Sequence, residues 1–137
     1  MSVWPKTLPV TPSLSTAEGA LISVSIHVEP PCLESLLEAL ALVSFPINPQ
    51  IYHDAALVYR YPDGRDETES VTLVEFPAYE GRLDEVRRAV EAYGFPLDCI
   101  HAIAMLDEIQ SDLQREPAPV GAPYVWRCRV KRRPAVV

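Results

Sequence analysis

The chain has 137 residues, 48% of them hydrophobic and 23% charged, which is enough for one hydrophobic core and too short for two comfortable domains. Its net charge is −7, although five of its twelve basic residues fall between positions 127 and 133. The acidic remainder disfavours nucleic acid and anionic membranes as partners. The basic segment is expected to pair with acidic residues of its own chain or of a neighbouring subunit.

The cysteines and the N-terminal residues indicate the compartment. Cys32, Cys99 and Cys128 are odd in number, widely spaced and without a CxxC motif, which favours free thiols in a reducing compartment. Residues 1–20 lack the pattern of a signal peptide, and no apolar run approaches the roughly 20 residues of a membrane span. We therefore expect a soluble cytoplasmic protein.

Two segments of the chain, fifty residues apart, resemble one another. Residues 21–47 align without a gap on residues 71–97, and the matches fall at positions that ought to be buried. The alignment predicts two similar βαβ halves, preceded by a proline-rich N-terminal arm over residues 1–20. The identical pairs are Val24/Val74, Leu33/Leu83, Ala39/Ala89, Phe45/Phe95 and Pro46/Pro96.

The first half reads as strand, helix and strand. Apolar residues alternate with polar ones over residues 21–28, which predicts a half-buried strand. Two prolines end that strand, and Pro31 suits the first turn of a helix. Leucines at helical spacing then form one apolar stripe, and Phe45-Pro46 ends the helix. A second strand is expected over residues 51–59.

The second half follows the same scheme. The turn sequence Tyr61-Pro62-Asp63-Gly64 predicts a hairpin that leads into a strand over residues 71–76. Gly81 separates this strand from a helix, and Gly94 suits the left-handed residue that ends the helix. The last strand is expected over residues 99–106. The buried stripe of the helix is expected to be Leu83, Val86, Val90 and Tyr93.

The C-terminal residues predict an extension of the domain. Residues 107–115 suit a short helix, residues 117–123 read as a linker, and residues 124–130 alternate like a strand with one apolar face. The expected division is an arm over residues 1–20, a βαββαβ domain over residues 21–108 and an extension over residues 109–137.

The order βαββαβ resembles the ferredoxin-like superfold, also called the split βαβ arrangement. The resemblance implies an α+β sandwich, in which a four-stranded antiparallel sheet carries both helices on one face. It covers residues 21–106 and is topological only. Within this superfold the chain is similar to ACT-like domains and PII-like trimers, which bind effectors at subunit interfaces, and to dimeric α+β barrels, which enclose a substrate.

The open face of such a sheet supplies the candidate site. Ser23, Ser25 and His27 from the first strand and Glu75 from the third should share this face on two adjacent central strands. A carboxylate beside an imidazole raises the histidine pKa and orients the ring, which suits ligand binding or proton transfer. The alternative is that these residues make ordinary hydrogen bonds at an interface.

Motifs for other chemistry are missing from the sequence. There is no Walker A, GxGxxG or GxSxG motif, no CxxC loop after the first strand and no set of metal ligands, so neither a cofactor nor a metal is expected. His53 and Asp54 are adjacent on a strand and face opposite ways.

Three functions fit these observations. The first is a ligand-binding or regulatory domain that forms a dimer or trimer through the open face, because Leu21, Val71 and Leu73 would leave an apolar patch there. The second is a small enzyme of the dimeric α+β barrel type, with His27 as general base and Glu75 orienting it. The third is an adaptor that docks a partner through its terminal arms.

Overall fold

The computed structural model describes residues 15–110 and 115–131. Three α-helices and seven strands form in these residues, joined in part by short 3-10 helices. In chain order they are β1 (Ser15–Thr16), β2 (Gly19–Val28), η1 (Pro30–Cys32), α1 (Leu33–Leu40), β3 (Gln50–Arg60), β4 (Asp66–Tyr79), η2 (Glu80–Arg82), α2 (Leu83–Ala92), η3 (Leu97–Cys99), β5 (Ile100–Ala104), α3 (Met105–Gln110), β6 (Arg115–Pro117) and β7 (Trp126–Val130).

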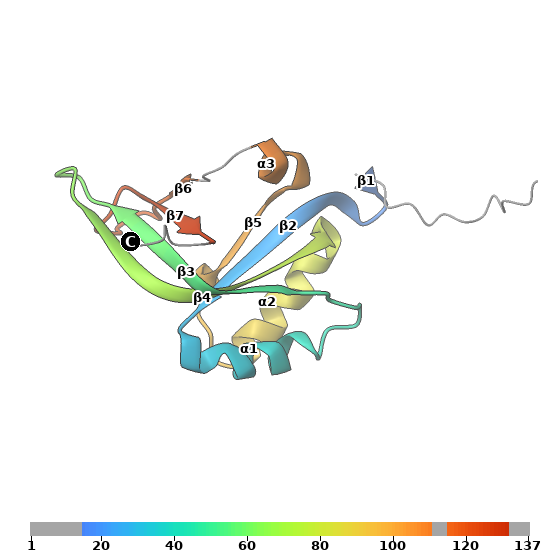
Figure 1. Cartoon of the computed structure of the whole chain (residues 1–137). Coiled ribbons are helices and arrows are strands. Elements are labelled where there is room, and N and C mark those ends of the chain that lie inside the picture. Colours follow the sequence, from blue (N-terminus) through green and yellow to red (C-terminus); the bar gives the residue numbers. More distant parts are fainter. Residues whose placement is uncertain (1–14, 111–114, 132–137) are drawn as a thin grey trace, which may run out of the picture.

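Six of the strands form one curled antiparallel sheet in the order β5-β2-β4-β3-β7-β6, and the short β1 pairs with the start of β2. Figure 1 shows α1 and α2 against one face of this sheet, while its β7–β6 end curls over the opposite face, on the side where α3 lies. The sheet is a half-barrel that curls away from the two helices.

The ferredoxin-like interpretation is wrong. It expected a four-stranded sheet with an open face, whereas β7 adds to the edge of β3, β6 adds to β7, and the six-stranded sheet curls over its own face. The sequence did predict an extra strand over residues 124–130, but not that it extends the sheet beside β3. From β2 to β5 the order of the main elements is strand, helix, strand, strand, helix, strand, and the class is α+β.

The two main helices occupy positions fifty residues apart, as the repeat predicts. The helix α1 begins at Leu33 and α2 at Leu83, each preceded by a 3-10 turn. Gly94 has a φ of 89° and ends α2, with the Phe95 amide donating to the carbonyl of Val90. Both helices pack their apolar stripes on one sheet face, but Tyr93, expected in the buried stripe of α2, follows the helix and is 39% exposed. The fully buried members of this core include Val24, Ile26, Leu36, Val74, Phe76, Val86 and Val90.

The turn between β3 and β4 forms as the sequence predicts. Gly64 has a φ of 86° and its amide donates to the carbonyl of Tyr61 at 2.9 Å. The strand β3, with 11 residues, exceeds the expected 51–59 by one residue at each end, whereas β4, with 14 residues, extends well beyond the expected 71–76. Their outer halves project past the two helices and give β7 an edge on which to pair.

The described residues also test the expected C-terminal elements. The helix α3 covers Met105–Gln110, and the strand β7 covers Trp126–Val130. Part of the expected linker is instead β6, since Pro117 pairs with Trp126. None of the helices in residues 15–110 and 115–131 has the length and apolar character needed to cross a membrane. Most of the expected N-terminal arm, residues 1–14, lies outside the described residues.

Candidate functional site

The sheet face opposite α1 and α2 is called the inner face below, because the sheet curls toward it. Its middle is apolar and is formed by β3 and β4, where Ala55, Leu57, Val71 and Leu73 are packed together. Val71 and Leu73 are 2% and 1% exposed, so the chain itself buries the apolar patch that was expected to drive oligomer formation. The expected dimer or trimer therefore loses its stated physical basis.

A row of polar residues crosses the inner face beside this apolar cluster. In the strand register, Ser25 of β2 lies opposite His101 of β5 on one side and Glu75 of β4 on the other, and Glu75 lies opposite Gln50 of β3. Four adjacent strands thus each contribute one polar side chain. Directly opposed residues in an antiparallel sheet are close enough to interact.

Two arginines of β7 reach across the curl to the opposite edge of the sheet. The Arg127 guanidinium donates to Glu116 of β6 at 3.1 and 3.2 Å and to the carbonyl of Asp98 at 2.5 Å. The Arg129 guanidinium donates to Glu116 at 2.5 Å and lies 3.0 Å from His27 Nδ1. These bonds join β6 and β7, at one end of the strand order, to the residues beside β5 at the other end.

A second ionic group lies toward α3. The Lys131 ammonium lies 2.9 Å from Glu75 and donates to Glu108 of α3 at 2.6 Å. The basic C-terminal strand therefore pairs with acidic residues of its own chain, which was one of the two arrangements expected from the charge distribution. Arg127 is only 5% exposed, so its contacts are interior, whereas the Lys131 side chain is 40% exposed and its pairs lie at the rim.

The two histidines of the inner face are neutral at pH 7. Burial, and then the charge of Arg129, lowers the pKa of His27 to about 3. Burial and Arg129 also lower the pKa of His101. Because Arg129 can only donate, His27 Nδ1 must accept, and the ring hydrogen then lies on Nε2.

The carboxyl between the arginines is ionised. Burial opposes the charge of Glu116, but the hydrogen bonds and charges of Arg127 and Arg129 outweigh it and lower the pKa. The pKa of Arg129 is lowered as well. Burial and the positive charge of Arg127 disfavour its charged form, and together they outweigh the favourable interaction with Glu116. The single Glu116 carboxylate is thus the counter-charge for two buried guanidinium groups, those of Arg127 and Arg129.

Three buried side-chain atoms have no hydrogen-bond partner in the described part of the chain. They are Ser25 Oγ, His101 Nε2 and Arg129 Nε, from β2, β5 and β7. Leaving one buried polar atom unpaired costs about 1–3 kcal/mol, so most such atoms in proteins have a partner. All three belong to the inner face, and three different strands supply them.

Cavities lie on both sides of the polar row, one toward each end of β2. His27 lines a cavity of about 490 Å³ together with Val71, Phe95 and Cys99, and Ser23 lines one of about 200 Å³ together with Glu75 and Glu108. Ser25 lies between Ser23 and His27 on the same face of β2. The two cavities therefore lie on either side of Ser25 along β2, while Ser25 itself lines neither of them.

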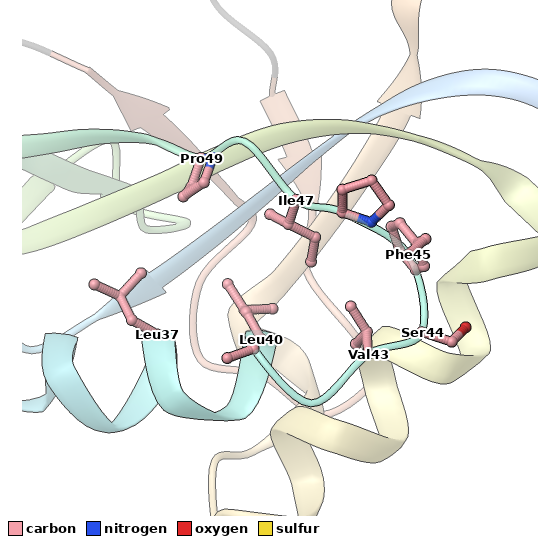
Figure 2. Close-up of a pocket in the computed structure, with 9 residues that line it drawn as sticks. Leu37, Leu40, Val43, Ser44, Phe45, Ile47 and Pro49 are labelled. Atoms are coloured by element: carbon pink, nitrogen blue, oxygen red, sulfur yellow. The ribbon is translucent and has the colours of Figure 1, made fainter.

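A further hollow, on the helix side, differs in chemistry. It has about 530 Å³ and lies between α1 and the segment that follows it, where Leu40, Val43 and Ile47 point toward one another (Figure 2). Ser44 also lines it, but its hydroxyl donates to Glu85 at 2.8 Å. This hollow offers apolar surface without an unpaired buried polar atom to orient a ligand.

The structure places all four sequence-predicted site residues on the inner face. Ser25 and Glu75 are directly opposed, as expected of adjacent strands, and Ser23 shares the smaller cavity with Glu75. The expected pairing of His27 with Glu75 does not form, because His27 lies opposite Leu73 and contacts Arg129, while Glu75 pairs with Lys131. The pKa of His27 is accordingly lowered, opposite to the expected direction.

Sequence reasoning did not bring together the residues that complete the site. His101 stood out only as a residue on the same strand face as Cys99, although pairing β5 antiparallel to β2 puts it beside Ser25. Arg127 and Arg129 were noticed only as part of a basic strand. Nothing in the sequence indicated that Glu116 belongs to the site, since it lies beside a segment that resembles a proline-rich linker.

Residues 15–110 and 115–131 contain no group of three or more His, Cys, Asp and Glu side chains placed to hold a metal ion. Cys32, Cys99 and Cys128 are free thiols. The sequence matches no protein-family model and no curated protein, so the functional inference rests on the geometry of the inner face.

Proposed function

We propose that this protein binds a small molecule in the interior of its half-barrel. The observation that carries the proposal is the set of three buried, unpaired polar atoms, Ser25 Oγ, His101 Nε2 and Arg129 Nε. A bound molecule with hydrogen-bonding groups would satisfy them. The cavity beside His27, whose wall includes Val71 of the apolar cluster, would contact the remainder of the molecule. Apolar walls with a few convergent polar groups are typical of ligand sites.

Binding fits these observations better than catalysis by His27. A general base works best with a pKa near the working pH, whereas that of His27 is about 3. The adaptor alternative required both terminal arms to be available for a partner. The C-terminal arm does not meet this requirement, since its strand β7 pairs with β3 of the same chain. The free thiols are consistent with a reducing compartment, and we propose the cytoplasm as the location.

A screen of neutral, acidic and basic fragments by protein-observed NMR tests the proposal. We expect hits that shift the side-chain signals of Arg129 and His101 together with amides of β2, β5 and β7. Ser25→Ala should weaken these hits, while Ser44→Ala, in the helix-side hollow, should leave them unchanged. The proposal fails if no fragment perturbs the inner face, or if the hits cluster at the helix-side hollow.

Self-association remains a separate proposal with a different surface. In α3, Leu106 and Ile109 are 50% and 72% exposed, and they lie three positions apart on one side of a helix. We propose that a homo-oligomer would bury this pair. Sedimentation velocity should show a species larger than a monomer that Ile109→Ser converts to monomer. A wild-type monomer at micromolar concentration would rule it out.

A further inference from the structure

The charges of the inner face are separated into two groups of opposite sign. At the end near β5, Arg127 and Arg129 share the single carboxylate of Glu116. At the end near α3, the single ammonium of Lys131 lies between Glu75 and Glu108. The first group has one positive charge in excess, and the second has one negative charge in excess.

The arginine end is where a further anion would be stabilised. Arg129 is 7% exposed in its side chain and uses its two terminal nitrogens, while its buried Nε has no partner among the described residues. The neighbouring imidazoles of His27 and His101 are neutral and do not balance the excess charge. A buried charge without a counter-charge is costly, so an added anion gains both a hydrogen bond and a favourable electrostatic interaction.

The surroundings of Arg129 indicate what else the molecule would contain. His27, which contacts Arg129, and Cys99, whose carbonyl accepts from Arg129 at 3.4 Å, both line the cavity of about 490 Å³. Val71, Tyr93 and Phe95 add apolar and aromatic surface to its wall. Glu29 and Glu69 also line it and are exposed, so a negative group is favoured at the inner end, beside Arg129, over the rim.

We propose that the ligand is a small carboxylic acid with an apolar or aromatic body, whose carboxylate binds beside Arg129, Ser25 and His101. This inference rests on the proposed function and specifies its ligand. Arg129 Nε and the Ser25 hydroxyl donate to the carboxylate. The apolar body occupies the cavity beside His27.

Benzoate and benzamide are matched probes, because they share a ring and a size but differ in charge. Calorimetric titration of the full chain should give an affinity for benzoate at least tenfold higher than that for benzamide.

Arg129→Gln should weaken benzoate binding by about tenfold or more, the usual effect of losing a charge-assisted hydrogen bond. Glu116→Gln should strengthen it, because one competing carboxylate is neutralised. Arg60→Gln changes the net charge equally at an exposed pair with Asp66, and should leave the affinity unchanged.

Several outcomes would overturn the inference. Equal affinity for benzamide and benzoate would show that charge is not recognised, while leaving small-molecule binding in place. Displacement of benzoate by an equal concentration of inorganic phosphate would indicate a site for a free inorganic anion. If Arg129→Gln fails to fold, as judged by circular dichroism, Glu116→Gln provides the test: the inference is contradicted if this variant does not bind benzoate more tightly than the wild type. Failure of all fragments in the NMR screen would instead remove the proposed function itself.

Discussion

The Ser25 hydroxyl is expected to favour ligand binding while lowering the stability of the folded protein without ligand. This hydroxyl is buried and unpaired in the described structure, between two strands that also carry polar side chains. A protein keeps such a group at a cost in stability when a ligand uses it.

Replacing Ser25 with alanine should raise the free energy of unfolding by about 1 kcal/mol, because the desolvation cost of the unpaired hydroxyl disappears. Urea unfolding without added ligand measures this change. Ser44→Ala is the control and should lower stability slightly, since the Ser44 hydroxyl is bonded to Glu85. A loss of stability in Ser25→Ala would show that this hydroxyl has a partner in the folded protein.

His27 predicts how stability depends on pH. Its folded-state pKa of about 3 lies below the ordinary value of 6.5, so between these values the unfolded chain binds the proton more tightly. The contribution of His27 is therefore complete above about pH 6.5 and falls by up to about 1.4 kcal/mol per pH unit as the solution is acidified toward pH 3.

Denaturant unfolding at several pH values between 7 and 4 tests this dependence. His27→Gln should make the decline shallower, although His101 keeps part of it because its pKa is also lowered. His53 is exposed on β3, and His53→Gln should leave the decline as in the wild type. Equal slopes for the wild type and His27→Gln would contradict a buried, neutral His27.

At the scale of elements, the strand β7 is an integral part of the sheet and not a loosely attached C-terminal extension. It pairs with β3 over five residues, and its arginines bond to groups on the far edge of the sheet. Hydrogen exchange should therefore show protected amides in β7, whereas the exposed loop around Val120 should exchange rapidly. Fast exchange throughout β7 would contradict its place in the sheet.

The elements that the sequence predicts well are those that local rules determine. The strand β2, the leucine stripe of α1, the turn at Gly64 and the cap at Gly94 all appear in the structure, although β2 is buried on both faces and not half-buried as predicted. Each depends on neighbours in the chain, through side-chain periodicity or backbone conformation. The length of β4 was underestimated, because its outer part, residues 66–70, is polar and bears no apolar alternation.

The site was only half predictable for a related reason. Ser23, Ser25, His27 and Glu75 follow from the pairing of two central strands. The partners Arg129 and Glu116 come from β7 and β6, and only the curl of the whole sheet brings them over β2 and β5. Curling of this kind depends on tertiary packing, which short-range sequence patterns do not specify.

At the scale of the whole molecule, the half-barrel is closed by side chains. Its end strands, β5 and β6, meet through His101 and Glu116, whose closest atoms are 3.6 Å apart, and through the contact of Arg127 with Asp98. The interior between them is polar and partly unsatisfied, while the helix side is an ordinary apolar core. The two faces of one sheet thus differ, since the helix side carries the larger apolar core and the inner face carries the unpaired polar atoms on which the proposed binding site rests.

The most direct measurement is a high-resolution crystal structure of the protein soaked with an acidic fragment from the screen. The half-barrel site predicts that the fragment lies on the inner face and hydrogen-bonds at least two of Ser25 Oγ, His101 Nε2 and Arg129 Nε. A structure in which ordered water satisfies all three atoms and the fragment is excluded, or binds elsewhere, would contradict it.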